Sequence, residues 1–204
     1  MKHRVCVFSS SSSTLAPEFY EDARILGELI GRNNMDLVYG GSKVGTMFEI
    51  AKAVKQNGGK LIGVMPEKLY NFGVHFDECD EFYLTKDMRT RKSKLDEASD
   101  SIIAMAGGFG TLDEVSEMLV LKQLGYNNKP IVFLNTNGYY NNLLKFYDDI
   151  VKNSFAKDTA ENLYYVAQTP KDAINYLLSY DYTPVKLTME DIYTRIPEGV
   201  TPKS

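Results

Sequence analysis

The strongest constraint on the fold is an alternation of short apolar runs with amphipathic stretches that continues along most of the chain. The apolar runs cover residues 4–8, 36–39, 60–65, 101–105 and 130–134, and the amphipathic stretches cover residues 17–32, 44–56, 111–123 and 139–152. Each run is rich in Val, Ile or Leu with few intervening polar residues, as in strands that are buried on both faces. The order predicts repeated βαβ units, and therefore an α/β fold with a parallel sheet and helices on both faces.

The amphipathic stretches have a helical period of their own. In residues 17–32, the apolar side chains of Phe19, Ala23, Leu26 and Ile30 recur at spacings of three and four, which gives one stripe that faces a core. Residues 88–98 and 170–178 also read as helices. We predict one Rossmann-like domain over residues 1–180. The periodicity fades from about residue 181, so residues 181–204 are predicted to be a C-terminal extension, either disordered or docked on a partner subunit.

Charge and composition exclude several classes of protein. The 23 Lys and Arg residues are outnumbered by 27 Asp and Glu residues, and the net charge of −4 gives no cationic field for a nucleic acid polymer. The apolar runs are far shorter than the roughly 20 residues that cross a bilayer, so no membrane partner is expected. Two cysteines, Cys6 and Cys79, do not form a disulfide scaffold. We therefore expect a reduced, cytoplasmic protein.

Two glycine-rich turns follow predicted strands and share the pattern Gly-Gly, spacer, Gly-Thr-x-x-Glu. The first is GGSKVGTMFE at residues 40–49, and the second is GGFGTLDE at residues 107–114. Open α/β sheets bind ligands at the carboxyl ends of their strands, where glycine backbone and helix N-termini can hold a phosphate. The same residues also fit a capping box, in which Thr46 or Thr111 caps a helix and Glu49 or Glu114 bonds back to the cap. We leave both interpretations open for Glu114 and favour the cap for Glu49.

Neither turn matches a common nucleotide fingerprint. Both lack G-x-G-x-x-G, and Thr46 stands where a P-loop requires lysine, so NAD binding and ATP hydrolysis are not predicted. The serine run of residues 9–13 follows the first strand at the same edge of the sheet. It includes Ser11, a candidate ligand contact whose alternative role is that of a solvated loop residue.

A basic segment precedes the strand that leads into the second turn. Residues 87–94 hold four cations, of which Arg91 and Lys92 could meet a phosphate at the glycines. The alternative is a solvated helix face that pairs with neighbouring carboxylates. Possible metal ligands at residues 75–80 have no second cluster of matching spacing, so no metal site is predicted.

The second turn and the basic segment together resemble a known family. Residues 106–114, AGGFGTLDE, resemble the P-G-G-x-G-T-x-x-E signature of the LONELY GUY (LOG) family of cytokinin-activating phosphoribohydrolases. Arg91 and Lys92 are similar to the Arg-Lys of that family's M-x-x-R-K motif. The resemblance extends over residues 3–180 and includes VYGG, IGVMP, QLG, KP and NGYY in family-like order.

This resemblance implies a Rossmann-like homodimer that hydrolyses the N-glycosidic bond of a purine nucleoside 5′-monophosphate to free base and ribose 5-phosphate. It implies catalytic roles for Arg91 and Glu114, and no metal or organic cofactor. The expected substrate contacts come from the glycine turns, the serine run and the basic segment: Lys92, Gly107, Gly108, Phe109, Gly110, Thr111, Gly41 and Ser11. Bacterial relatives often carry the label lysine decarboxylase. We reject it here because pyridoxal phosphate chemistry needs a Schiff-base lysine that the resemblance does not mark.

Several departures from the family pattern surround the expected site. Ala106 replaces the proline of the signature, Arg89 and Thr90 replace a usual His-Glu, and Phe48 replaces a small residue. The first turn has Ser42 for a third glycine, and Ser9-Ser10 stands for Cys-Gly. These changes leave the preferred base open between N6-prenylated adenine, adenine and another purine. We expect Arg89, Thr90, Phe48 and His75 to shape the base pocket.

Two further expectations concern assembly and class. Apolar residues of the stretch 111–123 spread over more than one helix face, which predicts a homodimer through helices next to the site. The alternative to an enzyme is a non-catalytic nucleotide-binding or carrier protein of the same fold. Release of free adenine from AMP would separate the two.

Overall fold

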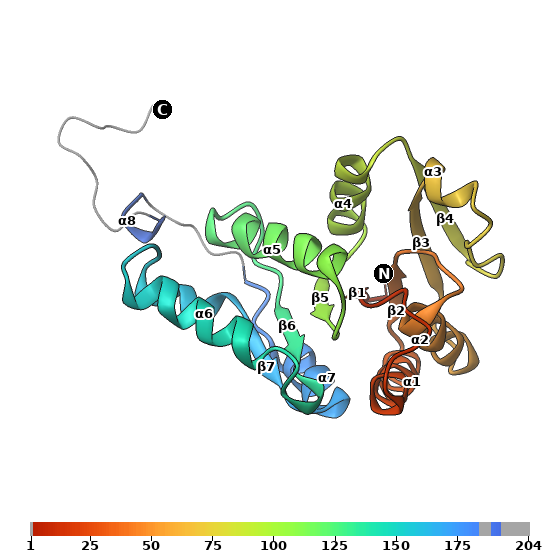
Figure 1. The fold of residues 1–204 in the computed structure, drawn as a ribbon, viewed down its shortest axis with the longest axis horizontal. Coiled ribbons are helices and arrows are strands. Elements are labelled where there is room, and N and C mark those ends of the chain that lie inside the picture. The colour runs from red at the N-terminus through yellow and green to blue at the C-terminus, as the bar shows by residue number, and fades with distance from the viewer. Residues whose placement is uncertain (1, 184–188, 193–204) are drawn as a thin grey trace.

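Seven strands form the central sheet of the computed structural model, which describes residues 2–183 and 189–192 (Figure 1). They lie in the order β4-β3-β2-β1-β5-β6-β7, and every neighbouring pair is parallel. The strands are β1 (Arg4–Phe8), β2 (Asp36–Tyr39), β3 (Leu61–Pro66), β4 (Glu81–Thr85), β5 (Ser101–Ala104), β6 (Ile131–Leu134) and β7 (Tyr165–Ala167). The predicted fold class is confirmed.

Helices connect the strands. They are α1 (Pro17–Arg32), α2 (Gly45–Gln56), α3 (Glu67–Tyr70), α4 (Met88–Glu97), α5 (Phe109–Gln123), α6 (Asn141–Lys152), α7 (Pro170–Ser179) and α8 (Met189–Ile192), with two 3₁₀ segments, η1 (Thr136–Gly138) and η2 (Asp158–Leu163). No helix within the described ranges has the length and apolar character that crossing a membrane requires.

The sheet separates two cores. On β1, Val5 and Val7 pack into the core that α1, α2 and α7 cover, whereas Cys6 and Phe8 pack into the core that α4, α5 and α6 cover. Successive side chains of a strand point to opposite faces, so a strand covered on both sides buries every residue. This double coverage explains the continuous apolar runs in the sequence.

The strand order creates a crevice at the middle of the sheet. From β1 the chain moves outward through β2 and β3 to β4, and then returns to place β5 on the other side of β1. Connections from β1 and β5 therefore leave in opposite directions, and such a switch point opens a ligand site at the carboxyl ends of the two strands. The serine run follows β1, and the second glycine turn follows β5.

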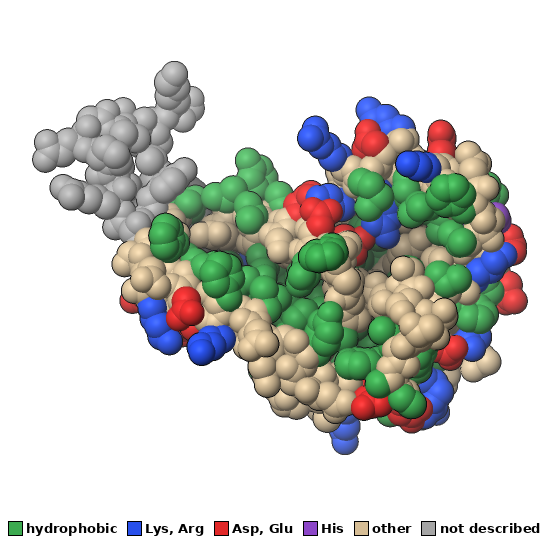
Figure 2. All heavy atoms as spheres, viewed as in Figure 1, with side chains coloured by type: hydrophobic (Ala, Val, Ile, Leu, Met, Phe, Trp, Pro, Cys, Tyr) green, Lys and Arg blue, Asp and Glu red, His purple; other side chains and the backbone are tan. Residues whose placement is uncertain are grey.

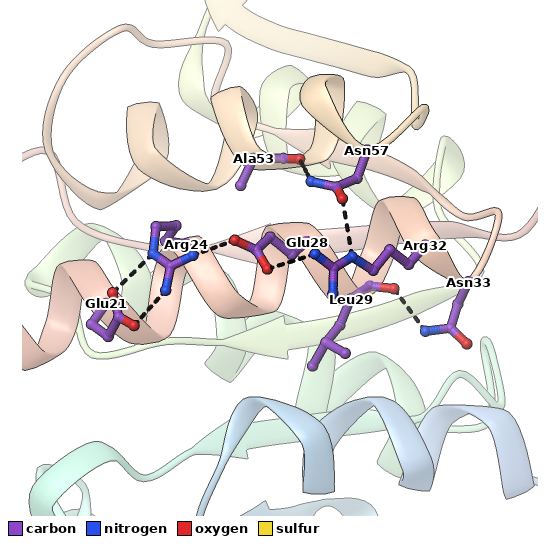
Figure 3. A network of polar contacts seen from close by, with 8 residues as sticks. All are labelled: Glu21, Arg24, Glu28, Leu29, Arg32, Asn33, Ala53 and Asn57. Atoms are coloured by element: carbon purple, nitrogen blue, oxygen red, sulfur yellow. Dashed lines mark hydrogen bonds and ion pairs between the residues drawn. The ribbon is translucent and has the colours of Figure 1, made fainter.

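Helix α1 shows which interactions hold the outer layer in place. Ala23, Leu26 and Ile30 of its predicted stripe are fully buried. On its outer side, Arg24 pairs with Glu21 and Glu28, and Arg32 continues the network to Asn57 of the loop after α2 (Figure 3). Exposed ion pairs of this kind contribute at most about 1 kcal/mol. The apolar stripe therefore supplies most of the stabilisation.

Two strands, β4 and β7, and two short helices, α3 and α8, were not predicted. Strands β4 and β7 lie at the two edges of the sheet, and β7 has only three residues. In the predicted C-terminal extension, Asn128 Nδ2 donates to the Thr183 carbonyl at 2.9 Å, and the Tyr182 ring meets His3 edge-on. Residues 181–183 thus lie against their own chain. Apart from α8, the rest of the extension lies outside the described residues.

Candidate active site

A cleft of about 440 Å³ lies at the carboxyl ends of the central strands. This volume is within the range of roughly 300–1,000 Å³ that is usual for small-molecule sites. Its lining combines the ends of β1, β2 and β3 with the starts of α2, α4 and α5: Val7, Phe8, Ser9, Ser11, Gly40, Ser42, Val44, Met47, Met65, Leu69, Phe72, Val74, Met88, Arg91, Gly110, Thr111 and Glu114.

One side of the cleft is apolar. Leu69 of α3, Phe72 just after that helix and Met88 of α4 line it and remain partly exposed, with Phe72 at 67%. The sequence analysis missed these residues. The segment after β3 shows no periodicity that would have singled them out, and the four-residue α3 is too short for a helical signal.

The residues expected to shape the base pocket lie outside this lining. Phe48 packs edge-on against Phe76 with 5.2 Å between ring centres, and His75 stacks on Tyr70 at 4.0 Å. Arg89 and Thr90 are exposed on the first turn of α4. Their sequence neighbours Met47, Val74, Met88 and Arg91 face the cleft instead.

Two threonines fasten the serine loop, residues 9–13, to the two glycine turns. Thr46 Oγ1 donates to the Ser10 carbonyl at 3.2 Å and accepts from the Ser10 N–H at 3.0 Å. On the other side, Thr111 Oγ1 donates to the Ser9 carbonyl at 3.3 Å. The two turns are therefore alike in structure as well as in sequence, and they hold the loop between them.

The capping-box interpretation is wrong for both turns. Helix α2 begins at Gly45 and α5 at Phe109, so both threonines lie inside the first turn, and neither helix has a side-chain cap. Glu49 pairs with Lys52 at 2.9 Å on the surface of α2. Because each threonine bonds to the serine loop instead, Glu114 is available for another partner.

The N-terminus of α5 is open, whereas that of α2 is partly occupied. The Met47 N–H of α2 donates to the Ser10 carbonyl at 3.4 Å. Within the described part of the chain, the N–H groups of Phe109, Gly110 and Thr111 have no hydrogen-bond acceptor, and open space surrounds Gly108 and Gly110. Free N–H groups at a helix start bind anions, so the second turn is the better phosphate site.

Gly107 has a structural reason to be glycine. A Cβ there would collide with the side chain of Thr111, whose hydroxyl holds the serine loop. The Tyr139 hydroxyl donates to the Gly107 carbonyl at 2.6 Å and so holds the second glycine turn against the start of α6. The close approach of Gly107 to Thr111 therefore holds the open N-terminus of α5 next to the serine loop.

Arg91 of α4 and Glu114 of α5 form a buried ion pair in the wall of the cleft. Arg91 Nη1 donates to Glu114 Oε1, and the two side chains are only 10% and 7% exposed. Arg91 Nε also donates to the Val64 carbonyl at 3.0 Å, which anchors the guanidinium to β3. Sequence reasoning brought both residues to the site, but it did not predict that they pair.

Burial and the attraction of Arg91 act on the pKa of Glu114 in opposite directions. Burial raises the pKa of Glu114, and the positive charge of Arg91 opposes that shift without cancelling it. A carboxyl group with a raised pKa in a cleft is a candidate for handling a proton near neutral pH. Hydrogen bonds within the described residues engage only Oε1, so Oε2 is available to a ligand.

Lys92 lies outside the lining of the cleft. Its Nζ is 2.9 Å from Asp113 Oδ1 and 2.5 Å from Glu117 Oε2, and the hydrogen bond to Glu117 raises the pKa of Lys92. The ammonium group therefore ties α4 to α5 beside the Arg91–Glu114 pair. This is a different environment from the direct phosphate contact expected from the sequence.

The structure divides the other predicted substrate contacts into two groups. Ser11, Gly110 and Thr111 line the cleft. Gly41, Gly107, Gly108 and Phe109 do not; Gly41 accepts from the Phe76 N–H at 2.8 Å, and Phe109 is 92% exposed at the start of α5.

The described residues hold no cluster of metal ligands. Within residues 2–183 and 189–192, no group of three or more His, Cys, Asp or Glu side chains could hold a metal ion. In the segment with possible ligands, His75 Nε2 lies 2.9 Å from Asp77 Oδ1 and Cys79 Sγ lies 3.4 Å from the Tyr39 hydroxyl.

Comparisons with known proteins cover most of the chain. A family model described as "Possible lysine decarboxylase" matches residues 47–177. The chain is 40% identical over 178 residues to a protein of Oryza sativa subsp. japonica named probable cytokinin riboside 5′-monophosphate phosphoribohydrolase LOGL2, covering 87% of this chain and 72% of that protein. It is 37% identical over 177 residues to cytokinin riboside 5′-monophosphate phosphoribohydrolase LOG3 of Arabidopsis thaliana, covering 87% and 82% of the two chains.

Solved structures add a relative of a different description. The molybdenum cofactor binding protein from the phototrophic bacterium Rippkaea orientalis superposes with a TM-score of 0.68 at 27% identity, over 88% of this chain and 97% of that one. The same fold is thus found in proteins named as hydrolases and in a protein named for binding.

Proposed function

Since the chain belongs to the LONELY GUY family, we propose that it hydrolyses the N-glycosidic bond of a purine nucleoside 5′-monophosphate, an N6-modified adenine or AMP-type nucleotide, and releases the free base and ribose 5-phosphate. The observation that carries the proposal is the buried Arg91–Glu114 pair beside the open N-terminus of α5. A carboxylate and an anion-binding helix end on the same cleft match the two ends of such a substrate.

The 5′-phosphate is assigned to the start of α5. The free N–H groups of Phe109, Gly110 and Thr111 supply donors, and the positive end of the helix dipole favours a dianion. Glycine at positions 108 and 110 leaves open space there. Arg91 adds a second positive charge on the same side of the cleft. The negative charge of Glu114 places the ribose, rather than the phosphate, next to that carboxylate.

Glu114 acts on the bond that breaks. When the bond between C1′ and the base nitrogen lengthens, positive charge grows on the ribose, and a carboxylate near C1′ stabilises it. Water then forms the new bond to C1′, and the electron pair of the broken bond leaves with the base, which takes up a proton. The Glu114 carboxylate, whose pKa burial raises, can accept a proton of the attacking water and return it to solvent, and solvent supplies the proton that the base takes up.

Arg91 and Lys92 have different parts in this scheme. Arg91 keeps Glu114 ionised and oriented through the hydrogen bond to Oε1, and it attracts the nucleotide. Lys92 is a positioning residue, because its contacts with Asp113 and Glu117 hold α4 against α5. The mechanism uses no metal or organic cofactor. Decarboxylation of lysine would need a lysine for pyridoxal phosphate, and none is among the described residues that line the cleft.

The proposal includes a homodimer. Helix α6 has no fully buried residue. Its Leu143, Leu144 and Tyr147 pack partly against the chain's own core, and Ile150 and Val151 line an apolar cavity with Val120 of α5. Val120 on the neighbouring α5 is 50% exposed, and hydrophobic side chains gather over α5 and α6 in Figure 2. A second copy would cover this surface, and closed dimers are the commonest solution. Two free thiols are consistent with a reducing, cytoplasmic location.

The second candidate function is a carrier that binds a nucleotide-like molecule without cleaving it. The likeness to the molybdenum cofactor binding protein favours it. A panel of purine nucleoside monophosphates, scored by released base, separates the two functions and identifies the preferred base. A carrier would bind members of the panel and release no base.

Glu114→Gln is the decisive variant. The amide keeps the size of the side chain and can accept from Arg91, but it cannot carry negative charge or take a proton. We expect turnover to fall by roughly 10²–10⁴-fold in a protein that still folds, and Arg91→Ala to cause a comparable loss of turnover. Glu49→Gln, at the same position of the first turn, is the matched control and should retain full activity. Normal base release by Glu114→Gln would refute the assignment and direct attention to Asp113.

A further inference from the structure

A second cavity, which several polar side chains line, lies at the opposite end of α5 from the cleft. Its volume is about 190 Å³, and its lining includes Lys122, Lys157, Thr159 and two asparagines. Helix α5 has 15 residues, so at about 1.5 Å per residue roughly 20 Å separates this cavity from the open helix end. The cavity plays no part in the proposed hydrolysis.

Lys122 is a buried cation that has no carboxylate partner among the described residues. The residue is 8% exposed, and no ion pair within the described part of the chain involves it. Its Nζ lies 3.1 Å from the Tyr180 hydroxyl and 5.0 Å from the centre of that ring. Burial lowers the pKa of Lys122 to about 8. A buried charge without a counter-ion is costly, so the protein retains this lysine at the expense of stability.

Among the described residues, the Lys122 ammonium group has only one hydrogen-bond acceptor and no counter-ion. The Tyr180 hydroxyl donates its own proton to Asn128 Oδ1 at 3.0 Å, so it accepts one of the three ammonium N–H groups. The other two have no acceptor among the described residues. Because Lys122 lines the cavity, a ligand there could accept from them.

Other lining residues complete an anion site. Lys157, just before η2, brings a second ammonium group that makes no ion pair within the described residues, and Thr159 supplies a hydroxyl. Asp191 also lines the cavity, but it has an interaction of its own and no ion pair joins it to either lysine. Ala160, Leu163 and Ile192 add an apolar side.

We infer that this cavity binds a small oxyanion ligand, a carboxylate or phosphate group carried on a short apolar body, between Lys122 and Lys157. Two ammonium groups supply the charge, and the apolar side favours a ligand with a few carbon atoms. The ligand would provide Lys122 with the counter-ion that residues 2–183 do not supply.

The test follows Lys122 directly by NMR of the full-length protein labelled with ¹³C at lysine Cε. Its pKa is measured alone, with inorganic phosphate and with butanoate. We expect one or both probes to raise the pKa of Lys122 from about 8 towards the ordinary 10.5. Phosphate also suits the start of α5, but binding there is too distant to move this signal. A response to one probe only would identify which oxyanion the cavity accepts.

Variants give the second readout. Lys122→Met should weaken binding of the effective probe at least tenfold by calorimetry, whereas Lys171→Met, an exposed lysine of α7, should not change it. If Lys122→Met fails to fold, the NMR titration of the unmodified protein still decides. The proposal is overturned if neither probe moves the Lys122 signal, if its pKa is already near 10.5 without a probe, or if Lys122→Met binds as tightly as the parent.

Discussion

Replacing Arg91 by methionine isolates the energetic role of the buried ion pair. Methionine keeps an unbranched apolar stem of similar length and removes the charge. Glu114 is then left in a site where its side chain is 7% exposed, without the guanidinium that opposes its desolvation. Removing one partner of a buried pair is usually strongly destabilising because the remaining charge is uncompensated.

The magnitude follows from the least costly response, which is to bury Glu114 in its protonated form. Starting from the ordinary pKa of 4.5, protonation costs about 3.4 kcal/mol at pH 7 and about 0.7 kcal/mol at pH 5, at about 1.36 kcal/mol per pH unit. Loss of the hydrogen bond to the Val64 carbonyl adds roughly 1 kcal/mol at either pH. Because the pKa of Glu114 is already raised in the parent, these sums are upper bounds, and we expect Arg91→Met to lose at most about 4 kcal/mol at pH 7 and at most about 2 kcal/mol at pH 5.

The sign of the pH dependence is fixed by which state holds the proton. Between pH 4.5 and the raised pKa of Glu114, the folded variant binds a proton that the unfolded chain releases, so its stability falls as pH rises and recovers as pH falls. Urea denaturation followed by circular dichroism, at pH 5 and pH 7, measures both losses relative to the parent protein.

Two further proteins complete the experiment. Arg24→Met removes the exposed ion pairs of Arg24 with Glu21 and Glu28 on α1 (Figure 3), and it should leave the free energy of unfolding nearly unchanged at both pH values. The double variant Arg91→Met/Glu114→Gln should recover the pH-dependent part of the loss while remaining inactive. A loss in Arg91→Met that is equal at pH 5 and pH 7 would refute the reasoning.

Three other predictions follow from the site and the apolar surface. Gly45 and Gly58 both have a positive φ, at +60° and +86°, but a Cβ on Gly45 would collide with the backbone of the serine loop, whereas Gly58 has open space around it. Gly45→Ala should therefore lower the free energy of unfolding by roughly 2 kcal/mol more than Gly58→Ala in urea denaturation. Equal losses would contradict the close packing at Gly45. Adenosine, which lacks the phosphate, should be cleaved with a kcat/KM roughly 10–100-fold below that of AMP, and equal efficiencies would remove the phosphate site. The parent protein should sediment as a dimer at micromolar concentration and Val120→Arg as a monomer; a monomeric parent would contradict the homodimer.

Sequence patterns predicted the central layers of this fold because those layers are buried on both faces. The bounds of α1 and of the first two strands agree with the prediction, since apolar periodicity reports coverage by neighbours. Strands β4 and β7 were missed because an edge strand is covered less completely. In β4, Glu81 stands beside two aromatic residues, and only Thr85 is fully buried.

The site was predicted in its members but not in its pairings. Glycine and threonine spacing marked both turns, yet the same spacing suggested caps that do not form, because the hydroxyls of Thr46 and Thr111 bond to a loop distant in sequence. Likewise, the basic segment gave Arg91 and Lys92 equally as contacts for a phosphate. Only the packing of α4 on α5 shows that Arg91 faces the cleft and Lys92 faces Asp113 and Glu117.

The fastening of the serine loop by two threonines bears on how quickly a nucleotide enters and leaves. Opening the cleft on that side would break the bonds of Thr46 and Thr111 together, whereas α3 on the opposite side is a single turn with no buried residue. Amide hydrogen exchange should therefore be slow at Ser10 and fast from Leu69 to Phe72. A nucleotide bound in the cleft would then enter and leave past α3 and not past the serine loop.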